Sequence, residues 1–182
     1  MVNKENILRK LLDGNGLYGD IFSEKRTYTH IQLESDRIEK LERGLDEGVG
    51  LRLINPWKMY FASTNNMDEG NLLDMAGTLS RFSREKSKSQ QKKIQKQNGF
   101  YPFTIIKDPE GIDIDEKLTI VKKIGTMAKK MEPRIRQVRV VYRDTHQTTY
   151  IYTSDGKDFK DNRTQVVLSL LLVGEEKEEI QT

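Results

Sequence analysis

Hydrophobic positions along the first half of the chain predict a short helix followed by strands. Near the N-terminus, four apolar residues share one helical face. They are Ile7, Leu8, Leu11 and Leu12. From residue 17 to about residue 54, apolar and polar residues alternate, which predicts antiparallel strands with tight connections. We expect turns at residues 34–36, at Gly44 and at residues 46–48, where glycine and charged residues gather.

A further strand near residues 59–61 precedes a second predicted helix. Asp68 and Glu69 suit the positive N-terminal end of that helix. Its predicted buried stripe consists of Leu72, Met75, Ala76, Leu79 and Phe82. Residues 85–99 are then rich in Lys, Ser and Gln, so we interpret them as a polar, basic linker.

The second half repeats the order of helix and then strands. A helix is predicted over residues 116–131, with a buried face made of Leu118, Val121, Ile124, Ala128 and Met131. Strands are predicted at residues 135–142, 148–153 and 164–173, with turns at 144–147 and 154–157. Because residues 166–173 are apolar almost throughout, we expect the last strand to be buried and central.

These elements predict an α+β fold of two small units, each a helix plus antiparallel β-strands. The expected division is residues 1–84 for the first domain, 85–99 for the linker and 100–182 for the second domain. Alternating βαβ units are not indicated, because strands follow one another along the chain.

Composition restricts the chemistry further. The 182 residues include no cysteine, which excludes disulfides, thiolate zinc ligands and a cysteine nucleophile, and fits a cytoplasmic location. No apolar run approaches the roughly 20 residues that span a bilayer, so we expect no membrane partner. The net charge is only +3, and the basic stretch 81–96 has Phe82 as its only aromatic residue. Nucleic-acid binding is therefore not favoured.

Candidate catalytic groups are scarce. His30 and His146 are the only histidines, and no helical pair of the HExxH or HExxxH type is present. We therefore expect no catalytic, metal-binding or cofactor-binding residue in this chain. Gly48 and Gly50 flank Val49 ahead of a predicted strand. They fit either a β-bulge or a place where a second backbone approaches closely, and both interpretations stay open.

Seven segments in order resemble the TldD/PmbA family. They are Tyr18-Gly19-Asp20-Ile21-Phe22, Asp36-Arg37-Ile38-Glu39, Gly48-Val49-Gly50-Leu51-Arg52, Phe61-Ala62-Ser63-Thr64-Asn65, Glu132-Pro133-Arg134-Ile135-Arg136-Gln137-Val138, Thr153-Ser154-Asp155-Gly156 and Ile180-Gln181-Thr182. Members of this family are described as modulators of DNA gyrase and as metallopeptidases. The resemblance implies the N-terminal and middle domains of a longer protein.

The same resemblance implies a zinc metallopeptidase that acts on peptides or unfolded proteins. The HExxxH motif of the TldD-type subunit lies in a C-terminal part that this chain does not contain, so the chain itself would be non-catalytic. It would bind a substrate strand and contact a second subunit, in a homodimer or in a heterodimer with a related subunit. The candidate substrate or interface residues are Gly48, Gly50, Arg52, Phe61, Ser63 and Thr64.

An alternative hypothesis is a stand-alone binding module that modulates DNA gyrase without peptidase activity. A gene that ends near Thr182 favours this alternative, whereas a reading frame that continues into HExxxH excludes it. The sequence does not decide between TldD-type and PmbA-type subunits.

Overall fold

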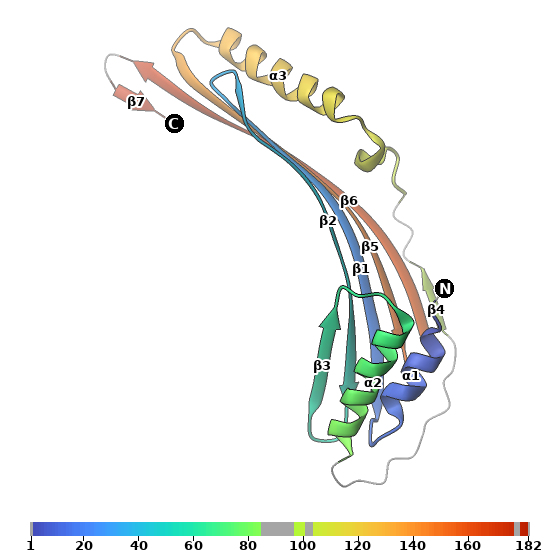
Figure 1. The fold of residues 1–182 in the computed structure, drawn as a ribbon. Coiled ribbons are helices and arrows are strands. Elements are labelled where there is room, and N and C mark those ends of the chain that lie inside the picture. The colour runs from blue at the N-terminus through green and yellow to red at the C-terminus, as the bar shows by residue number, and fades with distance from the viewer. Residues whose placement is uncertain (1, 85–96, 101–103, 177–178, 182) are drawn as a thin grey trace. The chain divides into compact units, whose positions relative to one another are not determined.

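The computed structural model describes residues 2–84, 97–100, 104–176 and 179–181. They form three α-helices, a short 3₁₀ helix and seven strands (Figure 1). The helices are α1 (Lys4–Leu12), α2 (Glu69–Ser83), η1 (Pro109–Gly111) and α3 (Ile114–Met131). The strands are β1 (Tyr18–Glu34), β2 (Arg37–Ile54), β3 (Met59–Thr64), β4 (Gln97–Phe100), β5 (Ile135–Thr153), β6 (Lys157–Glu176) and β7 (Glu179–Gln181).

All seven strands belong to one sheet, in the order β3-β2-β1-β5-β6-β4, with β7 paired to β6. Ser35 and Asp36 have positive φ angles of 46° and 68° and form the tight turn between β1 and β2. Gly156, with φ of 88°, lies in the turn between β5 and β6. The turns predicted at residues 34–36 and 154–157 are therefore confirmed, and so is the predicted α+β fold class. The pairing of β4 with β6 is parallel, whereas β3 and β7 pair antiparallel with their neighbours.

The chain forms two compact units that do not follow the sequence in order. Unit 1 comprises Met1–Lys25, Asp46–Phe103 and Thr148–Asn162, and unit 2 comprises Arg26–Leu45, Thr104–Gln147 and Arg163–Thr182. The interleaving arises because β1, β2, β5 and β6 are each long enough to contribute to both units. The sequential division into 1–84, 85–99 and 100–182 stays a prediction. Residues 85–96 of the expected linker lie outside the described residues, and residues 97–99 belong to β4.

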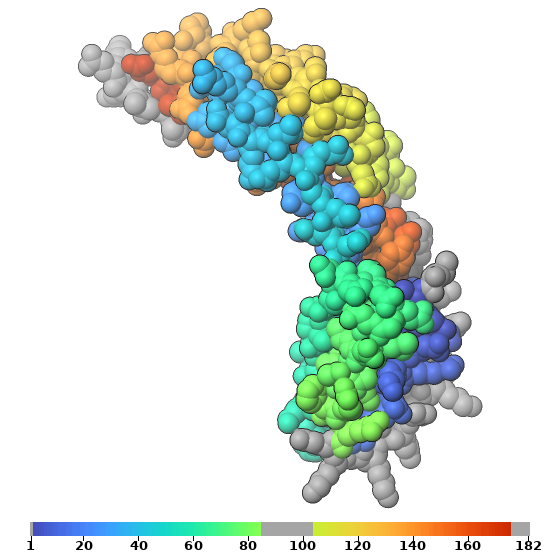
Figure 2. Space-filling model, in the orientation of Figure 1, coloured from blue at the N-terminus to red at the C-terminus, as the bar shows by residue number. Residues whose placement is uncertain are grey.

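In unit 1, α1 and α2 cover one face of the sheet (Figure 1), and they form an outer surface of this unit in Figure 2. The Asn3 side chain accepts a hydrogen bond from the Asn6 amide at the start of α1, and Asp68 caps α2 in the same way. The hydrophobic core between helices and sheet contains Ile7, Leu8, Leu11, Ile21, Val49, Leu51, Leu53, Leu72, Ala76, Leu79 and Tyr152. Buried polar residues of the same unit include Asp20, Asn55, Ser80, Ser83 and Thr153.

Unit 2 packs α3 on its own part of the sheet. Its core contains Ile31, Leu33, Val121, Ala128, Val138, Val140 and Tyr142. Gly125 of α3 lets the helix approach β1, since a Cβ atom there would lie 2.5 Å from Cδ2 of Leu33. A charged side chain is also buried here: Lys117 is only 1% exposed.

Three predicted turns are wrong, because the strands run straight through them. β2 is continuous across Gly44 and residues 46–48, and β5 is continuous across residues 144–147. A Cβ atom at Gly44 would lie 2.4 Å from the Tyr28 ring, so this glycine makes room for an aromatic side chain. The polar residues Asp144 and His146 make ion pairs with other elements rather than a turn.

Several burial predictions are also wrong. Phe82 and Met131 are 61% and 81% exposed, while Ser80, Ser83 and Lys117 occupy buried positions on the same helices. The final strand is not a buried central strand. Its exposed apolar residues, at 41–55%, are Val166, Val167, Leu168, Leu170 and Leu171. Within the described residues, α3 covers only one face of unit 2, and no strand pairs with the outer edge of β6 between residues 161 and 173.

Candidate functional site

A groove of about 610 Å³ lies on the sheet of unit 1, beside strand β3. Strands β1, β2 and β3 and the residue after β3 line it. The lining residues are Phe22, Glu24, Asp46, Glu47, Gly48, Val49, Gly50, Phe61, Ser63, Thr64 and Asn65. We call it the β3 groove. Because β3 is the last strand of the sheet order, no described strand covers its outer edge.

Strand alternation explains why the groove forms. Val49, Leu51 and Leu53 point into the core under the helices, so Gly48, Gly50 and Arg52 belong to the opposite face of β2. Across the strand pair, Gly50 lies opposite Ser63 and Arg52 lies opposite Phe61. Glycines in place of side chains leave this face hollow.

Phe61 partly occupies the space above Gly50. A Cβ atom at Gly50 would lie 2.9 Å from Cε2 of the Phe61 ring, and that ring is 60% exposed. Gly50 does not have a positive φ angle, so a β-bulge that requires a positive φ angle does not explain why glycine occupies this position. Gly50 therefore makes room for the aromatic ring of Phe61, which belongs to the neighbouring strand of the same sheet.

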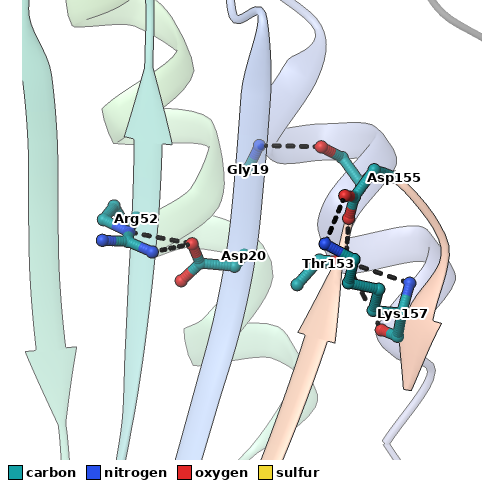
Figure 3. A network of polar contacts seen from close by, with 7 residues as sticks. Gly19, Asp20, Arg52, Thr153, Asp155 and Lys157 are labelled. Atoms are coloured by element: carbon teal, nitrogen blue, oxygen red, sulfur yellow. Dashed lines mark hydrogen bonds and ion pairs between the residues drawn. The ribbon is translucent and has the colours of Figure 1, made fainter. Parts of the chain in front are cut away.

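Arg52 serves a different purpose from the other candidates. Its guanidinium group donates hydrogen bonds of 2.6 and 2.8 Å to the Oδ2 atom of Asp20, which is only 5% exposed (Figure 3). The hydrogen bond and charge of Asp20 raise the pKa of Arg52 above its usual value. This pair connects β1 to β2, and Arg52 is not among the groove's lining residues. We assign it a structural role.

The turn between β5 and β6 is held to β1 by a second polar network. The Gly19 amide donates to the Ser154 hydroxyl at 2.9 Å, and the Ser154 amide donates to the Gly19 carbonyl at 2.8 Å (Figure 3). Thr153 donates to the Asp155 carboxylate, whose pKa is lowered chiefly by this hydrogen bond and also by Lys157. The Thr153–Gly156 segment therefore fixes the hairpin against β1.

Unit 2 contains a polar cluster that the sequence did not indicate. The His146 ring lies 2.9 Å from Asp108, and carboxylate or ring atoms of Asp108, Glu110 and His146 lie within 4.8 Å of one another. His146 is 38 residues from Asp108 and neither sits at a helical ligand spacing, so no sequence pattern could have paired them. Glu110 is exposed and the other two are half-buried.

A buried ion pair lies in the same unit. Lys117 Nζ is 2.7 Å from Asp144 Oδ2 and 3.2 Å from the Thr29 hydroxyl. Burial, and then the hydrogen bond to Asp144, raise the pKa of Tyr142 well above its ordinary value. Asp144 and Thr29 also line a cavity of about 240 Å³. The alternating polar residues near 144 thus form an internal network.

Five of the six predicted site residues meet in the β3 groove: Gly48, Gly50, Phe61, Ser63 and Thr64. Sequence reasoning missed the contributions of Phe22, Glu24, Asp46 and Glu47. Strand alternation places Phe22 and Glu24 on one face of β1, but the pairing of β1 with β2 was needed to bring them beside Asp46. Within the described residues, no helix is long and apolar enough to span a bilayer.

Comparison with known families agrees with this architecture. Residues 19–81 match the model of PmbA/TldA metallopeptidase domain 1, and residues 107–182 match that of the PmbA/TldA metallopeptidase central domain. The two models together cover most of the chain, which therefore belongs to the PmbA/TldD metallopeptidase family.

Individual relatives are similar over the whole chain but are much longer. A metalloprotease of Methanocaldococcus jannaschii is 27% identical across 100% of this chain, which spans 40% of that relative. A Bacteroides thetaiotaomicron structure named for modulation of DNA gyrase has a TM-score of 0.75 and 18% identity, covering 97% of this chain and 42% of its own. TldE from Thermococcus kodakarensis also has a TM-score of 0.75, with 13% identity and coverage of 98% and 40%.

This chain lacks the sequence motif that the family resemblance associates with its metal. The sequence contains no HExxxH motif and no cysteine, and its two histidines are 116 positions apart. His30 lies on β1, where its ring is 3.9 Å from the Glu42 carboxylate, and it is not part of the Asp108 cluster. The described residues hold no ligand set of the kind the family motif would supply.

Proposed function

We propose that this chain is the non-catalytic N-terminal and middle region of a PmbA/TldD-type metallopeptidase, and that unit 1 binds an extended segment of a peptide or unfolded-protein substrate. The observation that carries the proposal is the β3 groove, which adjoins the free edge of β3. An open strand edge offers main-chain donors and acceptors to any extended peptide, and an adjoining groove receives its side chains.

The shape of the edge supports a peptide rather than a small ligand. Met59 and Phe61 are 62% and 60% exposed on β3, which spans only six residues. Large exposed apolar side chains beside an unpaired strand are typical of a surface that a partner covers. Main-chain pairing makes little demand on sequence, which suits a substrate recognised in an unfolded state.

The remaining functions belong to the longer protein in this proposal. Zinc and the catalytic residues would be supplied from outside this chain, in a TldD-type subunit. A second subunit, identical or related, would complete the assembly, and the similarity to TldE supports a partner from within the family. The absence of cysteine supports a cytoplasmic location.

The test compares two positions on one strand. Phe61→Ala removes a groove residue, and Met59→Ala removes a side chain of equal exposure on the same face of β3 that does not line the groove. Binding is measured by fluorescence anisotropy with a labelled, unstructured eight-residue peptide of alternating Leu and Gln. We expect Phe61→Ala to weaken binding about tenfold and Met59→Ala less than twofold, on the pattern of central aromatic anchors. Equal effects, or no binding by the unaltered chain, would refute the proposal.

A further inference from the structure

Unit 2 contains a cluster of metal-ligating side chains that the proposed function does not use. Asp108 and Glu110 belong to the segment around η1, and His146 belongs to β5. One nitrogen or oxygen atom from each of the three side chains lies within 4.8 Å of the other two. An imidazole from a strand therefore meets two carboxylates from a different part of the chain, and divalent transition metals bind this mixture of ligands.

The spacing of the three side chains is close to that of a coordination sphere. Zinc binds imidazole nitrogen and carboxylate oxygen at about 2.0–2.2 Å, so two ligand atoms of a tetrahedral site are about 3.4 Å apart. The Nδ1 atom of His146 already lies 2.9 Å from Oδ2 and 3.1 Å from Oδ1 of Asp108. Glu110 must come closer, and it has the freedom to do so, because it is exposed while the other two are half-buried.

The two half-buried ligands are held in place without a metal. Asp108 caps η1, and its Oδ1 atom accepts a hydrogen bond of 3.0 Å from the Glu110 amide. His146 lies on β5 two residues after Asp144, and hence on the same face of the strand as that buried carboxylate. A metal ion therefore has little side-chain ordering left to impose on these two residues.

The charges around the cluster favour a cation. Glu110 also lines the cavity of about 240 Å³, together with Arg43 and Asp144. The charge of Asp144 is matched by Lys117 at 2.7 Å. Arg43 then contributes one positive charge against the two carboxylates of the cluster, so the local charge is negative when His146 is in the neutral form that ligates metals. The cavity offers room for the water that completes a coordination sphere.

We propose that Asp108, Glu110 and His146 bind one Zn²⁺ ion, which joins the segment around η1 to β5. The imidazole favours zinc over Mg²⁺ and Ca²⁺, whose preferred ligands are oxygen atoms. Three protein ligands leave a fourth position for water. All three ligands belong to unit 2, so the inference does not depend on the proposed peptide-binding function of unit 1. It departs from the expectation that this chain contains no metal-binding residue.

Zinc titration of the untagged, full 182-residue chain tests the proposal. The chain is first treated with a chelator and dialysed, and binding is measured near neutral pH by isothermal titration calorimetry. We expect one Zn²⁺ ion per chain and a higher melting temperature with zinc than without it, because a ligand that binds only the folded state stabilises that state. Mg²⁺ at the same concentration should have neither effect. An absence of zinc binding, or equal binding of Mg²⁺, would refute the proposal and leave Asp108 and His146 as an ordinary ion pair.

Three variants locate the ion. His146→Gln should weaken zinc binding at least about tenfold, since even changes to residues that only contact a metal ligand cost about ten- to hundredfold. Glu110→Gln should weaken it as well, and because Glu110 is exposed this change should leave the fold intact, which circular dichroism checks. His30→Gln is the matched control, because it removes the only other histidine, which lies on β1 outside the cluster. If His30→Gln weakens binding as much as His146→Gln, or if neither ligand variant weakens it, zinc binds elsewhere and the proposal is refuted.

Discussion

The two units use the same elements, helices packed on a sheet, but bury their ion pairs to different depths. In unit 1 the Asp20 carboxylate is buried, whereas the side chain of its partner Arg52 is 43% exposed. In unit 2 both partners are buried, since the side chains of Lys117 and Asp144 are only 1% and 4% exposed. The comparison indicates that the integrity of unit 2 depends on a fully buried ion pair, whereas in unit 1 the cation keeps its contact with solvent.

The largest expected effect comes from breaking that internal pair. Lys117→Met leaves Asp144 buried without its cation, which should lower the free energy of unfolding by about 3 kcal/mol or more. Lys122→Met, at an exposed position of the same helix, should change it by less than about 0.5 kcal/mol. Urea denaturation followed by circular dichroism measures both.

A double variant separates the charge from packing. Adding Asp144→Asn to Lys117→Met removes the uncompensated charge and should recover much of the lost stability. If the single and double variants are equally unstable, the ion pair does not account for the effect.

The next effect concerns the close contact between the chain after α1 and α2 in unit 1. A Cβ atom at Gly14 would lie 2.7 Å from the backbone oxygen of Ser80 and 2.5 Å from the hydroxyl of Ser83. Because the backbone cannot move cheaply, Gly14→Ala should destabilise unit 1 by about 1–3 kcal/mol. Gly111→Ala is the matched control, since nothing lies within 4 Å of its Cβ position. Equal melting temperatures for the two variants would contradict this account.

Gly50→Val should have a smaller effect on stability and a larger one on binding. The new side chain would contact the Phe61 ring, which is exposed and can rotate away, so we expect a change of less than about 1 kcal/mol. The displaced ring and added bulk should reduce peptide affinity in the anisotropy assay. A large drop in melting temperature, or unchanged affinity, would show that Gly50 does not shape the groove.

The smallest effect is a pH dependence in unit 2. Burial, together with Arg143 and Lys40, lowers the pKa of His30 below 6.5, while Glu42 opposes this shift. As the pH falls below about 6.5, the unfolded chain takes up the proton before the folded chain does, so stability should decrease between pH 7 and 5. His30→Gln should flatten this slope in urea titrations, whereas His146→Gln should leave the His30 contribution in place. An unchanged slope in His30→Gln would contradict the assignment.

The sequence predicted most elements but not how far each strand extends. Local periodicity located α1, α2, α3 and the hairpin turns, because these depend on neighbouring residues. It failed at Gly44 and Asp144, which resemble turn residues but owe their presence to Tyr28 and Lys117, distant in sequence. It also failed for β6, since an apolar run cannot reveal whether a second layer or a neighbouring strand covers it.

The candidate site was predictable in part for the same reason. Gly48, Gly50, Phe61, Ser63 and Thr64 came from family resemblance and lie together because β2 and β3 are consecutive strands. The contribution of Phe22 and Glu24 depends on how β1 pairs with β2 over long strands, which local patterns do not specify. Arg52 belongs to one of the segments that resemble the family, and it was predicted as a site residue for that reason. Its side chain instead donates a hydrogen bond to Asp20.

The central claim is that a peptide pairs with the free edge of β3. Among the described residues, the stretch of β6 between its pairings with β4 and β7 offers a second open edge for comparison. Hydrogen–deuterium exchange of the chain, with and without a saturating concentration of the peptide of alternating Leu and Gln, tests the claim most directly. The account predicts slower exchange of backbone amides in β3, at residues 59–64, and unchanged exchange at residues 166–171 of β6. Protection of the β6 segment with no change in β3 would contradict it.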